Sequence, residues 1–518
     1  MKARTRRPAS PTRRLSVVVV GSGFAGLAAA IALKKVGVED LTVLERASEV
    51  GGTWQANRYP GVAVDTSILN YSLSFDPNPG WSRLYADGAE LLSYVKGIAE
   101  RHDVRRHIRF DTAVTEATYD VGSNTWQVML GDGSVLSADV LIPATGILST
   151  PKVPHIPGLE TFKGTVLHSA EWDSSFDASG RSIAQIGSGA TAAQLVPELA
   201  KSANALYVYQ RSAPWVFPRN DREIGRVEGA IYRRLPFVLK LKRWRQFWLN
   251  DIVQYGFEKQ NRTLDSQTRM AAAFLDRSVS DPDLRRALVP DYEIGCKRRV
   301  TSDDWYPTLQ RENVTLIPSA LTSVGEDSVV GVDGIARKVD TLVFSTGFSI
   351  SEMVPMKVFG NSGQELHSVW SQGAKTHLGI STAGFPNLFF VGGPNTGAGS
   401  GAAPFMLEAQ ARYVAQAVDY LARTDAVSLD LIDVVQERSY RQLQLRLAGA
   451  VYGSGCVGWY QNANGTIDTI WPGTAAEYWL RTRRFRPHDF HIVRAQESSS
   501  GNRSGATTRR SRPRRATR

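Results

Sequence analysis

The sequence contains very little cysteine and no long uninterrupted apolar run. Its 518 residues include two cysteines, Cys296 and Cys456, which are too few for a disulfide framework and are typical of a reducing compartment. The longest apolar stretches are of strand length or are broken by charges, so no transmembrane segment is expected. Arg13 and Arg14 lead directly into a strand, without the cleavable apolar region of a secretory signal. We therefore expect a cytoplasmic protein.

Motifs for metal binding and for nucleophilic hydrolysis are also missing. The eight histidines are scattered and neither cysteine has a companion at ligand spacing, so no metal site is predicted. No GxSxG turn marks a nucleophilic serine. The sequence also lacks the CxxC pair that a disulfide reductase requires.

The net charge of +11 is confined to the two ends of the chain. Residues 1–14 and residues 497–518 each carry +6, so the residues between them carry −1. Arg-rich ends of this composition are expected to be disordered tails, and no specific nucleic-acid partner is predicted from them. A role for the tails in RNA or membrane association, with the rest of the chain as a scaffold, is a distant alternative.

One internal segment, residues 222–248, mixes basic and aromatic side chains. This composition is typical either of a helix that lies on a membrane surface or of an exposed helix that packs one face on its own domain. The second interpretation is the simpler one, and peripheral membrane contact through 222–248 is kept as the alternative. The residues concerned are Arg233, Arg234, Lys240, Lys242, Arg243 and Arg245 among Leu235, Phe237, Val238, Leu239, Leu241, Trp244, Phe247 and Trp248.

A glycine-rich turn at residues 21–26 (GSGFAG) predicts a dinucleotide-binding unit. It follows the apolar run 17–20 and precedes the helical stretch 27–35, and the next apolar strand ends at Glu45. In this arrangement the helix N-terminus faces a pyrophosphate and the acid accepts a hydrogen bond from a ribose hydroxyl. Because Glu45 repels a 2′-phosphate, this unit favours FAD or NAD over NADP.

A second turn of the same kind occupies residues 187–192 (GSGATA). Here the strand after the helix, residues 205–209, is followed by Arg211 and Ser212 in place of an acid. A guanidinium and a hydroxyl at this position favour a 2′-phosphate, so this unit is predicted to bind NADPH. Gln185 departs from the apolar pattern of the leading strand, and a degenerate unit that binds nothing is the alternative.

Two later strands, each ending in a Thr-Gly turn at residues 145–146 and 346–347, are expected to close the two units. The chain then returns around 385–397, and a helix over 407–423 completes the first unit. We therefore predict an α/β fold with two Rossmann-like domains, the NADPH domain being inserted into a discontinuous FAD domain. The predicted boundaries are 15–150 and 340–496 for the FAD domain, 151–339 for the NADPH domain with a helical insertion at about 222–290, and basic tails at 1–14 and 497–518.

Two further motifs resemble those of a known family. Residues 162–173 follow the pattern FxGxxxHxxxWD just before the second glycine turn, and residues 51–65 contain GGTW, YPG and a following Asp65. Both resemble the fingerprints of type I Baeyer–Villiger monooxygenases, in the flavin-containing monooxygenase superfamily, over roughly residues 15–480. The resemblance implies an FAD- and NADPH-dependent enzyme that uses O₂ to insert one oxygen atom next to a ketone carbonyl. The product would be an ester or lactone, formed through a flavin peroxide.

The resemblance also implies a catalytic pair, Arg298 and Asp65. A peroxide that attacks a carbonyl must stay an anion away from water, which requires a fixed cation beside it. The family's arginine matches Arg298 in the segment 294–299 (IGCKRR), with Arg299 as the adjacent alternative. Its partner carboxylate matches Asp65, which would orient the guanidinium. Without the motif, the two residues would be interpreted as a surface ion pair.

The family's FxGxxxHxxxWD motif joins the two domains, so the resemblance implies that His168 couples their movement and is no general base. Trp172 favours ketones; relatives that oxygenate N or S atoms of small molecules, the alternative function, carry another aromatic residue there. The residues expected to serve in domain coupling are Phe162, Gly164, His168 and Trp172.

The expected cofactor-binding residues form two sets. Those of the first turn and of the segments after it are Gly21, Gly23, Phe24, Ala25, Gly26, Glu45, Arg46, Gly52, Thr53, Trp54, Tyr59, Asp65 and Tyr71. Those of the second turn and of later segments are Gly187, Ser188, Gly189, Ala190, Thr191, Arg211, Ser212, Lys297 and Trp459. In the second set, Arg211, Ser212 and Lys297 are suited to contact the 2′-phosphate. An ordinary exposed lysine is an equally good interpretation of Lys297. Trp459 resembles a tryptophan that lies near the nicotinamide in the family, and a core aromatic residue is the alternative interpretation.

Overall fold

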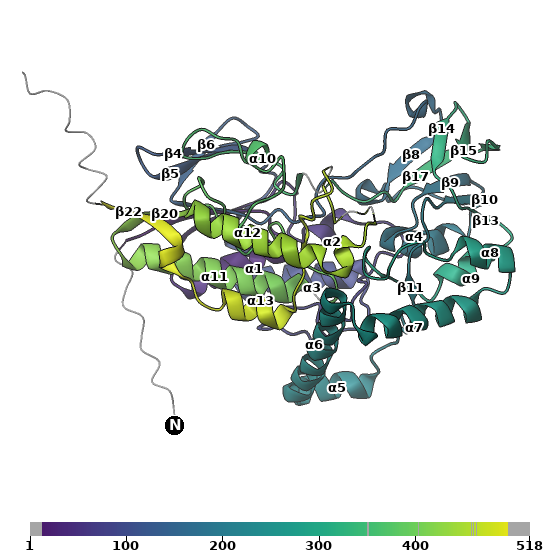
Figure 1. Cartoon of the computed structure of the whole chain (residues 1–518), viewed down its shortest axis with the longest axis horizontal. Helices are drawn as coiled ribbons and strands as arrows, with labels where there is room; N and C mark the ends of the chain where they lie inside the picture. Colours follow the sequence, from purple (N-terminus) through teal and green to yellow (C-terminus); the bar gives the residue numbers. More distant parts are fainter. Residues whose placement is uncertain are drawn as a thin grey trace, which may run out of the picture.

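The computed structural model describes residues 13–349, 352–401, 403–456, 458, 460–462 and 464–495. Two lobes lie side by side in it, each built around a parallel sheet (Figure 1). The predicted α/β class with two Rossmann-like units is confirmed. Most of the two predicted tails lies outside the described residues, but Arg13 is ordered, because its guanidinium pairs with Asp139 and its backbone N–H donates to Ala422.

The first lobe contains a four-stranded parallel sheet in the order β3-β2-β1-β7. Four of the five residues of β1 are buried, as expected for a strand with both faces covered. One face packs on α1, α3 and α11, and α1 and α11 lie against each other. The elements are β1 Ser16–Val20, α1 Phe24–Lys35, β2 Asp40–Leu44, α3 Gly88–Arg101, β3 Ile108–Arg109, β7 Val140–Pro143 and α11 Ala403–Arg423.

The chain returns to this sheet after a long excursion. The backbone of residues 387–391 runs beside β7, where Phe389 N–H donates to Leu141 at 3.1 Å and Val391 N–H donates to Pro143 at 3.1 Å. A second, mostly antiparallel sheet covers the other face, and its buried Trp126 donates to the Pro386 carbonyl at 2.9 Å. Its strands are β4 Val114–Asp120, β5 Thr125–Leu130, β6 Val135–Ala138 and β18 Lys357–Phe359.

The second lobe holds a five-stranded parallel sheet in the order β13-β10-β9-β17-β8. Helices α4 and α9 cover one face, and a three-stranded antiparallel sheet, β14-β15-β16, lies at the other. The bounds are β8 Thr165–His168, β9 Ser182–Ile186, α4 Ala190–Leu199, β10 Ala205–Tyr209, α9 Trp305–Leu309, β13 Val314–Ile317, β14 Leu321–Val324, β15 Ser328–Gly331, β16 Ala336–Lys338 and β17 Thr341–Phe344.

Strand β17 corrects one predicted boundary. It lies between β9 and β8, with Thr341 opposite both Ile183 and Thr165. The boundary placed between residues 339 and 340 is therefore wrong, because it assigned this strand to the first domain. The pairing agrees with the expectation that the strand before the Thr-Gly turn at 346–347 closes the second unit.

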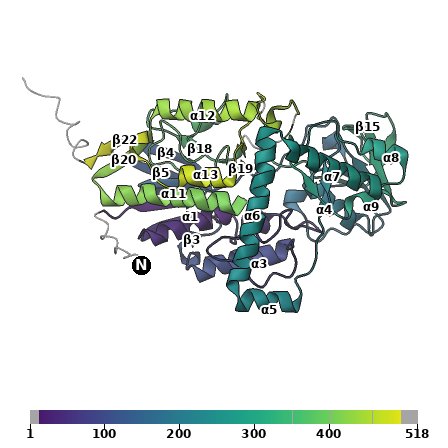
Figure 2. The ribbon, with the colours of Figure 1, turned by 60° about the horizontal axis from the view of Figure 1, so that its bottom comes forward.

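The segment expected to form a helical insertion contains four helices. It leaves and re-enters the second lobe through two paired strands, β11 and β12. Pro236 begins α6, where its fixed φ suits the first helical turn, and Asn261 and Asp281 cap the next two helices. In Figure 2, α6 runs across the front of the molecule with α5 at its base. The bounds are β11 Val216–Phe217, α5 Arg226–Arg234, α6 Pro236–Lys259, α7 Arg262–Ser278, α8 Pro282–Ala287 and β12 Val300–Thr301.

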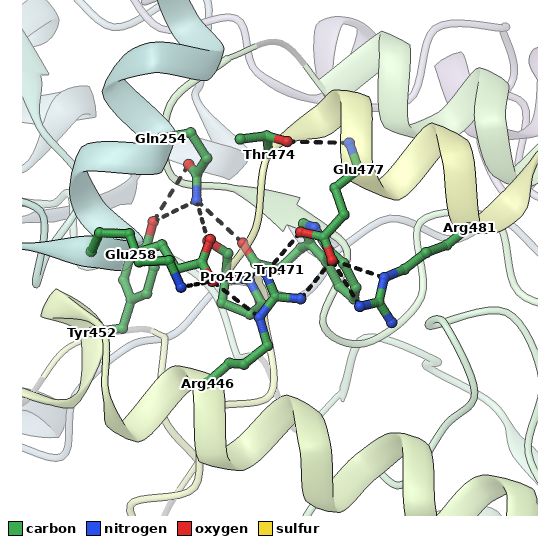
Figure 3. Close-up of polar contacts among 10 residues, drawn as sticks. Gln254, Glu258, Arg446, Tyr452, Trp471, Pro472, Thr474, Glu477 and Arg481 are labelled. Carbon is green, nitrogen blue, oxygen red and sulfur yellow. Dashed lines mark hydrogen bonds and ion pairs between the residues drawn. The ribbon is translucent and has the colours of Figure 1, made fainter.

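The last part of the chain ties α6 to the first lobe (Figure 3). Arg446 of α12 donates to Glu258 of α6 at 2.9 Å and to Glu477 of α13 at 2.7 Å. The remaining elements are α2 Thr53–Ala56, α10 Leu366–Val369, β19 Gly397–Ala398, β20 Ala426–Leu431, α12 Asp433–Ala448, β21 Ile470–Trp471, α13 Ala475–Thr482 and β22 Phe490–Arg494.

Cys296 and Cys456 form a disulfide, with their Cα atoms 6.2 Å apart. The sequence did not predict this bond, because two cysteines are too few for a disulfide framework. The cysteines are 160 residues apart in sequence, but the end of the helical insertion and the loop after α12 belong to one hydrophobic cluster, which holds Cys296, Tyr452 and Tyr460. Among the helices within the described ranges, none has the length and apolar composition needed to cross a bilayer.

Candidate functional site

A cavity of about 1550 Å³ is lined by both glycine turns and by segments of both lobes. It brings together most residues that the sequence singled out. Those lining it are Gly21, Gly23, Phe24, Ala25, Glu45, Arg46, Gly52, Thr53, Trp54, Tyr59, Asp65, Tyr71, Gly187, Ser188, Gly189, Ala190, Thr191, Arg211, Ser212, Lys297 and Arg298. The predicted residues outside this lining are Gly26, Phe162, Gly164, His168 and Trp172. Trp459 lies outside the described residues.

The two glycine turns are built alike. Gly21 has φ +104° and Gly187 has φ +111°, values that favour glycine. A Cβ on Gly21 would lie 2.7 Å from the Ala144 oxygen, and one on Gly187 would lie 2.5 Å from the Ser345 oxygen. In each lobe, therefore, the strand that ends in Thr-Gly passes directly against the first glycine. The N-cap and first residues of the helices that follow, residues 23–25 and 189–191, line the cavity.

The turns also fit the groups that the sequence predicts. A Cβ on Gly189 would meet no protein atom within 4 Å, so the N-terminus of α4 is open for a phosphate to approach the backbone. At the first turn, the Glu45 carboxylate is fixed by the backbone and hydroxyl of Ser22, at 2.8 and 2.7 Å, and by the backbone of Ala47 at 2.9 Å. Glu45 therefore stands at the end of β2, where an acid suits a ribose hydroxyl.

Asp65 and Arg298 form a two-pronged ion pair at the cavity wall. Arg298 Nε donates to Asp65 Oδ2 at 2.9 Å, and Arg298 Nη2 donates to Asp65 Oδ1 at 2.8 Å. The nearby Asp65 charge raises the pKa of Arg298, against the opposing effect of burial. About 36% of the Arg298 side chain stays exposed, and Arg298 lines the cavity. The pair thus presents one oriented guanidinium to whatever occupies the cavity.

Arg299 is directed elsewhere. Its Nη1 donates to the Gln267 Oε1 atom at 2.7 Å, and its guanidinium lies 5.2 Å from the centre of the Phe217 ring and 5.6 Å from that of Phe257. Burial, together with the adjacent Arg298 charge, lowers its pKa. Arg299 is not among the cavity-lining residues, so the geometry favours Arg298 over the adjacent alternative.

Gln194 of α4 holds the segment that carries Asp65, a role that the sequence analysis did not predict. Its Oε1 accepts from the Tyr59 hydroxyl at 2.8 Å, and its Nε2 donates to the Ala63 carbonyl at 2.9 Å. Burial raises the pKa of Tyr59 to about 12, so the phenol stays a donor. A helix of the second lobe therefore positions the segment of the first lobe that carries Asp65. A glutamine within an alanine-rich helix does not reveal a contact 135 residues away.

Lys297, Arg211 and Ser212 meet beyond the end of β10. Lys297 Nζ donates to Ser212 Oγ at 2.9 Å. The pKa of Lys297 is lowered, chiefly by burial and further by the Arg211 charge, and it is raised somewhat by Asp291. All three cluster residues line the cavity. Two cations and a hydroxyl in one corner are suited to a dianionic phosphate monoester.

The histidine motif of residues 162–173 lies beside the two segments that join the lobes. These segments run antiparallel, with Lys152 N–H donating to Gly347 at 2.9 Å and Ser349 N–H donating to Thr150 at 2.9 Å. The His168 ring, at the end of β8, packs 6.4 Å from the Phe348 ring in one of them. The pKa of His168 is lowered, chiefly by burial. Trp172 is buried against Phe176 in the core of the second lobe.

Comparison with known proteins agrees with this arrangement. Residues 14–357 match the family described as flavin-binding monooxygenase-like. A Baeyer–Villiger monooxygenase of Streptomyces coelicolor is 39% identical over 491 residues, covering 94% of this chain and 94% of the relative. A Baeyer–Villiger monooxygenase of Pseudomonas aeruginosa is 37% identical, covering 93% of this chain and 92% of the relative. The solved structure of an oxidized steroid monooxygenase bound to NADP superposes with a TM-score of 0.82 at 27% identity, covering 93% of this chain and 100% of that one.

Proposed function

The chain belongs to the flavin-binding monooxygenase-like family, among the Baeyer–Villiger monooxygenases, and on this basis we propose that it inserts one oxygen atom from O₂ next to the carbonyl of a small-molecule ketone. It is an NADPH-dependent flavoprotein monooxygenase, and its cofactors are FAD and NADPH. The proposed product is an ester or a lactone. The route through a flavin peroxide stays a prediction.

The two cofactors are assigned to the two lobes as part of this proposal. FAD would be held at the first turn, with Glu45 toward its ribose, and NADPH at the second turn, with its 2′-phosphate in the corner of Lys297, Arg211 and Ser212. The open α4 N-terminus and the cation cluster support this assignment. The fixed carboxylate at the first turn argues against a 2′-phosphate on the ribose there, since two anions would repel each other.

The observation that carries the proposal is the Asp65–Arg298 pair, at the wall of a cavity that both nucleotide turns share. When bound and reduced, the flavin supplies the chemistry by activating O₂. Arg298 contributes a permanent positive charge, which stabilises an anion that develops in the cavity. Asp65 fixes the direction of that charge through two hydrogen bonds, so the guanidinium does not have to reorganise as the reaction proceeds.

The remaining parts of the site have supporting roles in the proposal. Gln194 and Tyr59 keep the Asp65 segment attached to α4, so the pair is assembled only when the two lobes are together. His168 is proposed to couple the lobes, and its contact with Phe348 in a connecting segment supports this. A role for His168 as a general base is not supported, because its ring is outside the cavity lining.

The test is product analysis with the purified, FAD-loaded protein. We expect NADPH consumption under air to yield esters or lactones from part of a panel of cyclic, linear and aryl ketones, detected by mass spectrometry as a gain of one oxygen atom. Amines and sulfides form the second arm. Oxygenation of these substrates without ester from any ketone would replace the proposal by its alternative, an enzyme that oxygenates N or S atoms.

A further inference from the structure

Helix α6 exposes a continuous apolar stripe. Its members recur every three or four residues, so they share one face of the helix over about 27 Å. Between 43% and 64% of each residue is exposed. In Figure 2, no other helix or strand lies in front of α6. The stripe consists of Phe237, Leu241, Trp244, Trp248, Ile252 and Tyr255.

The face of α6 that packs on the molecule is buried, and it holds the polar Asp251, Gln254 and Glu258 beside the apolar Leu239 and Phe257. Asp251 accepts from the backbone of Ala475 at 2.9 Å and of Ala476 at 3.0 Å, at the beginning of α13. Gln254 donates to the Tyr452 hydroxyl at 3.1 Å, and Glu258 accepts from Arg446 (Figure 3). These contacts fix the rotation of the helix. Turning α6 to bury the stripe would remove a buried carboxylate from its donors, which is unfavourable because the charge would lose its hydrogen bonds.

The charged side chains around the stripe are of one sign. Both acidic residues of α6, Asp251 and Glu258, are buried, and the α5 acid Glu228 is already paired with Arg222 and Lys242. The exposed charges left on α6 and on the end of α5 are therefore basic. They are Arg233, Arg234, Lys240 and Arg245, besides the paired Lys242 and Lys259.

We propose that the apolar stripe of α6 and its basic flank dock on the surface of a bilayer that contains anionic lipids. Tryptophan and tyrosine have an apolar ring with a polar edge and favour the headgroup boundary, while lysine and arginine reach from there to the phosphates. A second copy of this chain is a poorer occupant, because a two-fold contact would bring like charges together. The helix lies on the membrane in this arrangement and does not cross it.

The docking places the lipid surface one helix away from the cavity. On the inner side of α6, Arg243 donates to the Ser72 carbonyl at 3.1 Å, and the Phe247 ring packs 4.8 Å from that of Phe405. Phe405 is followed by Met406, which lines the cavity. The segments that contact α6 thus continue into the cavity wall.

The experiment uses the full-length FAD-loaded protein and vesicles sedimented in low salt. Vesicles contain phosphatidylcholine alone or with 30% phosphatidylglycerol. We expect binding to the anionic vesicles, and Leu241→Glu or Trp244→Gln should weaken it by about 10- to 100-fold, the range for losing one buried apolar side chain. Leu445→Glu, at an exposed leucine on α12, is the matched control and should bind like the unaltered protein. The basic tails are the same in every variant, so their attraction to lipid cancels.

Further readouts separate the remaining explanations. Activity toward a water-soluble ketone should stay unchanged in every variant, since the substituted side chains face solvent. Failure of the unaltered protein to bind anionic vesicles would overturn the proposal, and so would Leu241→Glu binding as tightly as Leu445→Glu. Loss of a dimer in Leu241→Glu, seen by light scattering while vesicle binding persists, would assign the stripe to a second copy instead.

Discussion

Replacing Asp65 by asparagine removes the charge opposite Arg298 and keeps the size of the side chain. The pair makes two hydrogen bonds between charged groups, each contributing about 1.5 to 3 kcal/mol. Asparagine retains one acceptor oxygen, but it turns an amide N–H₂ toward the guanidinium in place of the second. We therefore expect the fixed orientation of Arg298 to lose about 2 to 4 kcal/mol. If that orientation acts in the transition state, ester formation slows by about 30- to 900-fold.

The assay for Asp65→Asn measures ester formed and NADPH consumed in the same reaction. We expect the ratio of ester to NADPH to fall, because Asp65 acts on the guanidinium that serves oxygen transfer. Glu477→Gln is the matched control, since Glu477 makes an equally two-pronged pair with Arg446, with both distances 2.7 Å, away from the cavity. It should lower the unfolding temperature and leave the ratio unchanged. An Asp65→Asn enzyme with an ester rate and ratio within about threefold of the original would refute the reasoning.

Three other outcomes follow from the structure. The pKa of Lys297 is lowered, so we expect the KM for NADPH to begin rising at a pH below the usual titration range of lysine. Lys297→Arg should shift that rise to higher pH without changing kcat. The same dependence of KM on pH in Lys297→Arg and in the unaltered enzyme would exclude Lys297 from NADPH binding. Burial lowers the pKa of His377 to about 4, so below pH ~6.5 the unfolded chain binds a proton that the folded chain does not bind. The free energy of unfolding should therefore fall by about 3 kcal/mol between pH 6.5 and pH 4. In His377→Gln, the free energy of unfolding should change less with pH over this range. Alkylation of the denatured protein without a reductant should leave Cys296 and Cys456 unmodified, and reduction should lower the free energy of unfolding by about 2 to 4 kcal/mol; two alkylated cysteines without reductant would contradict the disulfide.

The sequence predicted what local geometry determines. Each glycine turn needs only a strand before it, a helix after it and a residue at the end of the next strand, all within about thirty positions. Glu45 and Arg211 could therefore be assigned to different nucleotides before any contact was known. The pairing of Asp65 with Arg298, 233 positions apart, came from the resemblance, because no local rule joins them.

The features that the sequence did not predict depend on distant contacts. The Cys296–Cys456 disulfide forms because two loops that are distant in sequence share one hydrophobic cluster. The mixture of basic and aromatic residues in α6 predicted a helix with one face packed on the protein or on a membrane. Which face would be covered depended on buried partners such as Arg446, far along the chain.

The split first lobe has a consequence for synthesis on the ribosome. Helix α1 begins at Phe24, but α11, which packs against it, begins only at Ala403. At about 5 to 20 residues per second, the apolar side of α1 waits roughly 20 to 75 seconds for its partner. The second lobe, complete once Phe344 has emerged, finishes folding earlier, although it starts later in the chain. The part of the polypeptide that is translated first is thus the last to reach its native packing.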